Sequence, residues 1–230
     1  MRRLLFLIIG LLFLSMPTHA RSRSVADSCL HILNTNPKLS SLEKCDLLLT
    51  TIHNLNYEDN FISLTNLLIK EAAKSGSNYH LFYGYYEQGQ YHILNSGRTQ
   101  EGLGLLFKCL EIAKSNRLTL EEGFALYVIG NAFLQLQNQS NAEKYLKDAL
   151  YVFTHIPNKQ YYANTSLELA NLYLLQNRLD TALHLYQKAK TIFQTTDYTH
   201  ALAYTQGNIG IIQVKQNLKD SASINLSNTI

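Results

Sequence analysis

Small residues recur at intervals of 40 along the chain from residue 102 onward. One column holds Gly102, Ala142, Ala182 and Ala222. Columns with the same spacing hold Cys109, Ala149 and Ala189; Gly130, Ala170 and Gly210; and Phe153 and Phe193. A fixed period shared by several independent columns predicts a chain built from repeats of one supersecondary unit, each stacked on its neighbours.

The repeating unit is predicted to be a pair of antiparallel helices, because apolar residues recur every three or four positions in runs separated by short polar pieces such as "QNQSN" and "QNRLD". A small residue where two helices cross lets their axes approach. Residues that tolerate the left-handed conformation ending a helix fall in the predicted turns: Gly97, Asn177 and Asn217. Residues predicted to cap the second helix recur near its start: Ser140, Asp180 and Asp220.

These columns resemble the tetratricopeptide repeats, whose pattern is W-x2-L-G-x2-Y followed by A-x3-F and a small residue. The unit that matches best supplies Leu126, Ile129, Gly130, Phe133, Ala142, Leu146 and Ala149. The next unit supplies Leu169, Ala170, Tyr173, Ala182, Tyr186 and Ala189. The resemblance implies an all-α helical-hairpin solenoid of about four to five repeats. The period of 40 exceeds the family's usual ~34, and a HEAT-like solenoid is the alternative.

The first twenty residues are predicted to be a cleaved signal peptide. Arg2 and Arg3 precede an apolar run from Leu4 to Leu14, and a small residue, Ala20, stands where cleavage is expected. An uncleaved anchor is the alternative. The predicted domains are therefore a signal peptide over 1–20, an N-terminal helical segment over 21–38 and a repeat domain over 39–230. An exported location, periplasmic or extracytoplasmic, follows from this interpretation.

The sequence stops at Ile230, inside the last predicted helix and without a polar capping helix. We therefore expect a longer protein. Bacterial membrane sensors and transcriptional regulators resemble this chain in placing long-period repeats after a signal sequence. By that analogy a membrane helix and an output domain are expected to follow.

Charge and motifs exclude several functions. Two of the 20 basic residues lie in the signal peptide, which leaves 18 against 17 acidic residues, so nucleic-acid binding is not expected. No catalytic, metal or cofactor motif occurs, and the dispersed histidines are expected at the surface or in a groove. Cys29, Cys45 and Cys109 are predicted to be buried free thiols, with a Cys29–Cys45 disulfide as the alternative.

The resemblance implies a concave surface, formed by the first helix of each pair, that binds a protein or peptide. The residues placed there by the 40-residue phase are Glu87, Tyr91, Tyr127, Asn131, Gln135 and Asn171. An asparagine amide can pair with a peptide backbone in both directions, whereas Asn131 and Asn171 satisfying neighbouring helix groups is the alternative. Basic residues that would clamp an acidic C-terminal tail are absent at Tyr127 and Gln135.

A cluster of aromatic residues lies in "NYHLFYGYYEQGQY", residues 78–91. The phase places Tyr86, with Tyr79, Phe82 and Tyr83, on the packing side of a helix. Tyr91 is expected to face the groove and to matter little for stability, and Tyr85 lies off the packing stripe. The sequence therefore predicts a non-enzymatic, exported protein-binding or peptide-binding scaffold. A cell-surface protein that binds glycans or small ligands through such rings is the alternative.

Overall fold

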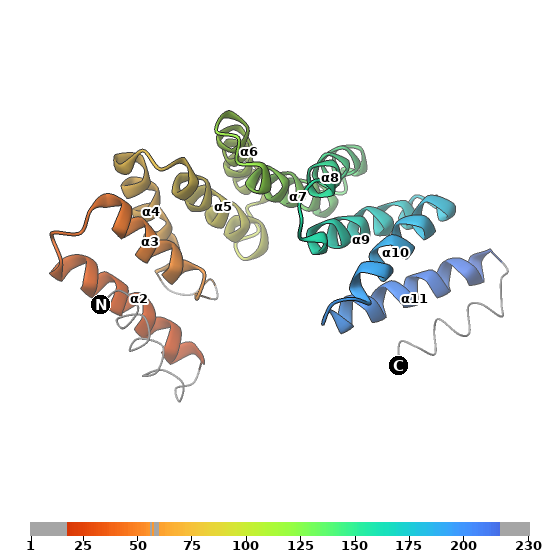
Figure 1. Ribbon diagram of the computed structural model, residues 1–230, viewed down its shortest axis with the longest axis horizontal. Coiled ribbons are helices and arrows are strands. Elements are labelled where there is room, and N and C mark those ends of the chain that lie inside the picture. The colour runs from red at the N-terminus through yellow and green to blue at the C-terminus, as the bar shows by residue number, and fades with distance from the viewer. Residues whose placement is uncertain (1–17, 56, 58–59, 217–230) are drawn as a thin grey trace. The chain divides into compact units, whose positions relative to one another are not determined.

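Every element described in a computed structural model of the protein is a helix. The structure describes residues 18–55, 57 and 60–216. The helices are α2 (Thr18–Thr35), α3 (Ser41–Ile52), α4 (Phe61–Ser75), α5 (Asn78–Leu94), α6 (Thr99–Ser115), α7 (Thr119–Gln135), α8 (Gln139–Thr154), α9 (Lys159–Leu175), α10 (Leu179–Phe193) and α11 (Thr199–Lys215) (Figure 1). The predicted all-α class is confirmed for the described part of the chain.

The 40-residue period of the sequence appears in the positions of the helices. Helices α6, α8 and α10 begin at residues 99, 139 and 179, and α7, α9 and α11 begin at 119, 159 and 199. The similar segments "EAAKS" and "EIAKS" close α4 and α6. In the later repeats the first helix of the pair is α7, α9 or α11, and we call these three the A helices.

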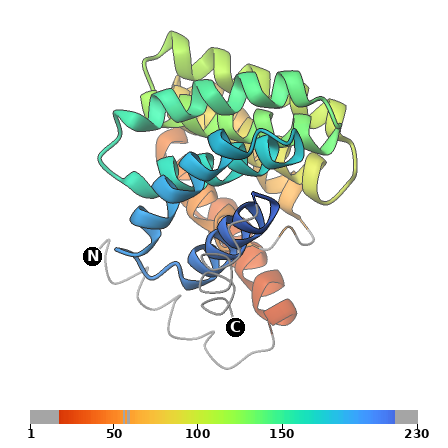
Figure 2. The same ribbon diagram turned by 90° about the vertical axis from the view of Figure 1, so that its right-hand side faces the viewer.

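The helices form two compact units, residues 1–112 and 113–230, with the boundary inside α6. In unit 1, α3 contacts α2, α4 and α5, and α4 packs against α5. In unit 2, each of the helices from α7 to α11 contacts the next, and α7 also touches α9; the green to blue ribbons of Figure 2 show this order.

The repeated small residues lie in the cores. Ala142, Ala149, Ala182 and Ala189 are fully buried in unit 2, together with Phe193. The core of unit 1 contains Cys29, Cys45 and Phe61 among its buried residues. The sequence columns therefore mark core positions, and burial of their apolar surface is the main source of stability.

Two helices of unit 1 meet backbone to backbone at glycine. A Cβ added at Gly102 on α6 would lie 2.6 Å from the carbonyl oxygen of Gly89 on α5. Real Cβ atoms do not approach an oxygen so closely. This contact gives the physical reason for a glycine at that position of the small-residue column.

The turns confirm part of the prediction for the helix ends. Gly97 and Asn177 have φ values of +66° and +58°, and Gln137 in the same phase has +56°. The residues that follow Gln137 and Asn177 close the helix ends. The N–H groups of Asn138 and Arg178 donate to the carbonyls five residues earlier, at Phe133 (2.9 Å) and Tyr173 (2.8 Å). Asn217 lies outside the described residues.

The prediction of the caps was off by two residues. The N-cap of α8 is Asn138, whose side chain accepts a hydrogen bond from the N–H of Asn141, and the N-cap position of α10 is Arg178. Ser140 and Asp180 lie inside the first turn instead. The Asp180 carboxylate accepts a hydrogen bond from Gln216 Nε2 at 2.9 Å, so it joins α10 to the end of α11. Asp220 lies outside the described residues.

Other sequence predictions have different outcomes. Cys29, Cys45 and Cys109 are buried and unpaired, as the first interpretation expected. Helix α2 occupies residues 18–35, so it covers most of the predicted N-terminal segment. The apolar stretch of the predicted signal peptide and the last small residue, Ala222, lie outside the described residues.

Candidate functional site

A group of polar side chains lies on the A helices of unit 2. Tyr127 and Asn131 come from α7, Glu168 and Asn171 from α9, and Tyr204 from α11. We call these five residues the A-helix face. The first four are half-buried, and the Tyr204 side chain is 54% exposed. Three of them, Tyr127, Asn131 and Asn171, were predicted from the sequence to bind a partner.

Hydrogen bonds join the members on α9 and α11. The Tyr186 hydroxyl of α10 donates to Asn171 Oδ1 at 2.6 Å, and the Tyr204 hydroxyl reaches the same oxygen at 3.4 Å. On its other side, Asn171 donates from Nδ2 to Glu168 Oε2 at 3.3 Å. The amide of Asn171 is therefore oriented by two tyrosines and directed at the carboxylate.

The Glu168 carboxylate is desolvated. Burial raises its pKa, and the hydrogen bond from Asn171 offsets only part of that rise. Its negative charge in turn adds to the burial that raises the pKa of Tyr127 and of Tyr186. Tyr186 and Tyr204 thus both bond to the amide that donates to this carboxylate.

Two other recessed carboxylates have cationic partners. Glu71 lies 2.6 Å from Lys74 Nζ, and that hydrogen bond lowers its pKa. Glu143 lies 2.6 Å from Lys147 Nζ and 3.2 Å from Arg178, and although burial raises its pKa, these bonds leave it lowered. Within the described residues, Glu168 forms no ion pair.

The Asn131 amide also has unused hydrogen-bonding capacity. Its Oδ1 atom is buried and makes no hydrogen bond to another described residue. An unsatisfied buried polar atom typically costs about 1–3 kcal/mol. The sequence left open whether Asn131 and Asn171 hydrogen-bond to neighbouring helix groups. Asn171 does so through Nδ2 and Oδ1, whereas Asn131 Oδ1 does not.

Gln135, the last residue of α7, is exposed and forms none of the contacts that hold the A-helix face together. The other two predicted residues, Glu87 and Tyr91, lie on α5 in unit 1. Glu87 Oε1 is 3.4 Å from His53 Nε2, which connects α5 to the end of α3.

Tyr91 is not the free surface ring that the sequence suggested. Its ring stacks on Phe61 with centroids 5.6 Å apart and an interplanar angle of 21°, and it also contacts Tyr57 at 6.0 Å. It packs against the core of unit 1. Tyr85, the other candidate ring, has Lys108 Nζ 5.4 Å from its centroid. Both rings therefore have partners within unit 1: Tyr91 packs on Phe61 of α4 and on Tyr57 of the α3–α4 connection, and Tyr85 lies beside Lys108 of α6.

The remaining aromatic residues of the 78–91 window pack largely as predicted. Phe82 is fully buried and stacks on Tyr86 at 5.4 Å, and Tyr83 is half-buried. Burial raises the pKa of Tyr86 well above its ordinary value. Tyr79 differs from the prediction, since 43% of it is exposed at the first turn of α5.

Ser77, His80 and Asp46 form an arrangement that resembles a catalytic triad. Ser77 Oγ lies 2.8 Å from His80 Nδ1, and His80 Nε2 lies 3.1 Å from Asp46 Oδ1. Ser77 is the N-cap of α5, and its Oγ also accepts from the His80 N–H. The buried imidazole, unlike the surface histidine that the sequence predicted, ties α5 to Asp46 on α3. These contacts cap α5 and link it to α3.

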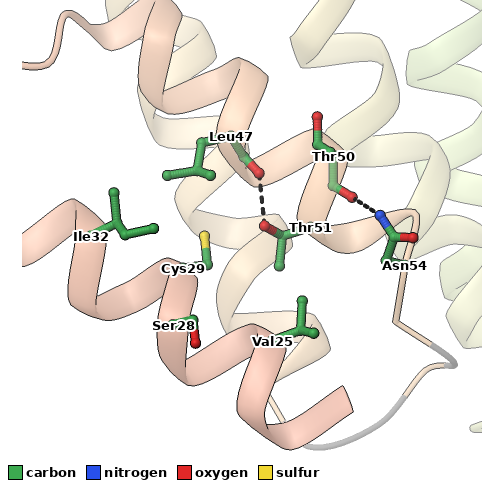
Figure 3. Close-up of a pocket in the computed structure, with 8 residues that line it drawn as sticks. All are labelled: Val25, Ser28, Cys29, Ile32, Leu47, Thr50, Thr51 and Asn54. Carbon is green, nitrogen blue, oxygen red and sulfur yellow. Dashed lines mark hydrogen bonds between the residues drawn. The ribbon is translucent and has the colours of Figure 1, made fainter. Parts of the chain in front are cut away.

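A small cavity lies between α2 and α3 in unit 1 (Figure 3). Its volume is about 80 Å³, and it is lined by Val25, Ser28, Cys29, Ile32, Leu47, Thr50, Thr51 and Asn54. Burial raises the pKa of the Cys29 thiol, with a small opposing effect from Thr51. A neutral thiol is a poor nucleophile, and Thr51 and Asn54 bond to backbone carbonyls of their own helix. The polar atoms of Thr51 and Asn54 in the lining are thus engaged with α3.

Metal binding and membrane crossing find no support among the residues that the structure describes. No group of three or more His, Cys, Asp or Glu side chains there could hold a metal ion. In the same residues, no helix combines the length and the apolar character needed to cross a bilayer.

Comparison with solved structures places the fold among helical-hairpin solenoids. The protein is similar to BtubC (BKLC) from P. vanneervenii, with a TM-score of 0.74 and 16% identity over 92% of this chain and 88% of that one. It is also similar to the STAND protein PH0952 from Pyrococcus horikoshii, described as having a tetratricopeptide repeat sensor, with a TM-score of 0.66 and 20% identity over 84% of this chain and 30% of that one.

A third similar structure is the MamA protein, with a TM-score of 0.54 and 18% identity over 89% of this chain and 90% of that one. No protein-family model and no curated protein sequence matches the chain. The fold is that of the tetratricopeptide-repeat solenoids, as the sequence columns implied.

Glu168, Tyr186 and Tyr204 were not predicted from the sequence as members of the site or its support. A signal was present, because position 168 has the same phase as Val128 and Asn208. An acidic residue in a column that is apolar one repeat earlier is unusual. Tyr186 was assigned to a core column, and its ring is indeed fully buried while its hydroxyl reaches Asn171.

Proposed function

We propose that the protein is a non-enzymatic scaffold that binds a protein or peptide through the A-helix face of unit 2. The observation that carries this proposal is the unused hydrogen-bonding capacity of that face. Asn131 Oδ1 makes no hydrogen bond within the described residues, and the Glu168 carboxylate accepts one, from Asn171. A peptide in extended conformation offers N–H groups at regular intervals that can bond to such oxygens.

The fold supports this function because stacked helix pairs present the same side-chain positions again in each repeat. Asn131 and Asn171 are such a pair, 40 residues apart on α7 and α9. Two amides in register on neighbouring A helices can contact two points of one extended ligand. Glu87 and Tyr91 are proposed as further contacts, although their present partners are His53 and Phe61.

An exported location is part of the proposal. It is supported by the paired arginines, the apolar run and Ala20 in the first 20 residues. Mass spectrometry of the protein recovered from its native cells is expected to find a chain that begins at Arg21. An intact chain beginning at Met1 would contradict cleavage.

We further propose that the repeats are the extracytoplasmic sensory or interaction region of a membrane sensor or transcriptional regulator. Support comes from the order of signal sequence and long-period repeats, and from the similarity in fold to a STAND protein whose repeats are described as a sensor. In the gene, an apolar run of about 20 residues followed by a kinase or helix-turn-helix segment is expected downstream of Ile230. A stop codon there would contradict this part of the proposal.

Binding is tested by selecting peptides from a displayed library of random nonapeptides on the purified protein. Affinities of the selected peptides are then measured by fluorescence anisotropy for the protein and for Asn131→Ala and Asn171→Ala. Each variant is expected to bind about tenfold more weakly, as befits the loss of one or two hydrogen bonds. A surface change on a neighbouring helix, His184→Ala on α10, is the control and should leave affinity unchanged.

Peptides that bind equally well to Asn131→Ala and Asn171→Ala would show that another surface is used. Failure of the library to yield any binder would contradict peptide binding itself. Circular dichroism melts of each variant show whether a loss of affinity reflects a loss of structure.

A further inference from the structure

The A-helix face contains one carboxylate that no described residue pairs with a cation. Glu168 is half-buried, accepts a hydrogen bond from Asn171 at 3.3 Å and forms no ion pair among the described residues. Glu71 and Glu143, which are also recessed, each have a lysine Nζ at 2.6 Å. Glu71 and Glu143 thus each have a cation within hydrogen-bond distance, whereas no described residue supplies one at Glu168.

Aromatic rings accompany this carboxylate. Tyr186 and Tyr204 both bond to the amide that donates to Glu168, and Tyr127 is close enough for the carboxylate to affect its ionisation. A cation is attracted to the faces of tyrosine rings. A carboxylate with tyrosines around it is thus suited to a positively charged group more than to a neutral donor.

Position makes the carboxylate available to a partner. Glu168 lies one turn before Asn171 on α9, on the same face as the Asn131 amide of α7. The ring of Tyr204 from α11, 54% exposed, lies beside it through the bond to Asn171. A side chain reaching inward from a ligand on this face can therefore meet the carboxylate.

We propose that Glu168 is a specificity site that receives a lysine or arginine side chain of the bound protein or peptide. This inference rests on the proposed function, because it names the chemistry of a ligand bound to the same face. The partner's cation supplies the counter-ion that α8 and α10 supply at Glu143 through Lys147 and Arg178 and that Glu168 lacks. Tyr186 and Tyr204 hold the Asn171 amide that donates to Glu168, so they help to fix the carboxylate that meets the cation.

The test uses nonapeptides selected from the displayed library. Each basic residue of a selected peptide is replaced in turn by norleucine, which keeps the length of the lysine stem and removes the charge. One replacement is expected to weaken binding to the protein about tenfold or more. In Glu168→Gln the lysine and norleucine peptides should bind within about twofold of each other, because the charge that distinguished them is gone.

Two further variants keep the result interpretable. Asp148→Asn removes an exposed negative charge from α8 of the same unit and should preserve the preference for lysine, which excludes a general effect of net charge. Glu168→Asp keeps the charge on a shorter stem and should preserve part of the preference. Thermal melts confirm that all three variants are folded.

The possible results separate the inference from the function on which it rests. Selected peptides without a basic residue, or a norleucine penalty that is the same in Glu168→Gln, would overturn the role of Glu168 and leave peptide binding intact. A library that yields no binder would contradict the proposed function and the inference together. A preference for lysine that disappears only in Glu168→Gln is the expected result.

Discussion

At Glu168 a carboxylate is partly removed from water, and no described residue supplies a cation in exchange. Burial raises its pKa in the folded state. Because the folded chain then binds this proton more tightly than the unfolded chain, the linked stability is fully present below the unfolded pKa. It is lost as the pH rises through the higher folded pKa. At neutral pH the free protein is therefore less stable than it would be with an uncharged side chain here.

Glu168→Gln is accordingly expected to raise the melting temperature of the free protein at pH 7, by roughly 2–4 °C. Gln keeps an oxygen that can accept from Asn171. At a pH of about 3.5, where Glu168 is protonated in both states, the melting temperatures of the two proteins should converge. Differential scanning calorimetry at both pH values makes the comparison. A variant that melts lower at pH 7 would mean that the charge stabilises the fold.

Tyr91 gives a second prediction for a single residue. Its stacking on Phe61 and its contact with Tyr57 imply that Tyr91→Ala lowers the free energy of unfolding by about 2 kcal/mol or more. Tyr151→Ala removes a tyrosine that is 72% exposed on α8 and should change it by less than about 0.5 kcal/mol. Urea titrations followed by circular dichroism provide both values. If both variants changed the free energy of unfolding by the same small amount, Tyr91 would not be packed against the core.

At the scale of helices, the contact between α5 and α6 depends on Gly102. A methyl group there would meet the Gly89 carbonyl oxygen at 2.6 Å, so Gly102→Ala should destabilise unit 1 by about 1–3 kcal/mol despite the better helix propensity of Ala. Gly104 lies on the same helix with nothing within 4 Å of an added Cβ. Gly104→Ala is thus the matched control and should stabilise by up to about 1 kcal/mol. Thermal melts that rank the two variants the other way would contradict close contact at Gly102.

Helix positions could be predicted from the sequence because small residues, turn residues and apolar columns all repeat with one period. The N-caps were misplaced because Ser140 and Asp180 repeat in phase, while the cap of α8 is Asn138 and Arg178 takes that position in α10. A periodic pattern identifies equivalent positions without fixing which of them begins the helix. Local cap geometry decides that, and it differs between repeats.

The candidate site was less predictable than the fold. Tyr127, Asn131 and Asn171 were found by phase, whereas the place of Tyr91 depends on Phe61 and Tyr57, which precede it by at least 30 residues. The surroundings of Glu168 depend on tyrosines from three helices. The pairing of His80 with Asp46 likewise joins α5 to α3. Contacts between residues far apart in sequence have no signature in a repeat pattern.

On the scale of the whole molecule, each described helix contacts chiefly the helices next to it in the sequence. A ligand on one face of unit 2 is therefore expected to meet residues from α7, α9 and α11. The other two helices of unit 2, α8 and α10, contribute Leu146 and Tyr186 to the core beneath that face. Binding is therefore expected to be a property of one face and to leave the outer residues of α8 and α10 unaffected.

Titration of ¹⁵N-labelled protein with a selected nonapeptide tests that claim most directly. We predict the largest amide and side-chain shifts at Asn131, Glu168 and Asn171, with little change at Tyr151 on α8 and His184 on α10. Shifts centred on α8 and α10, with none on α7 and α9, would contradict the assignment of partner binding to the A-helix face.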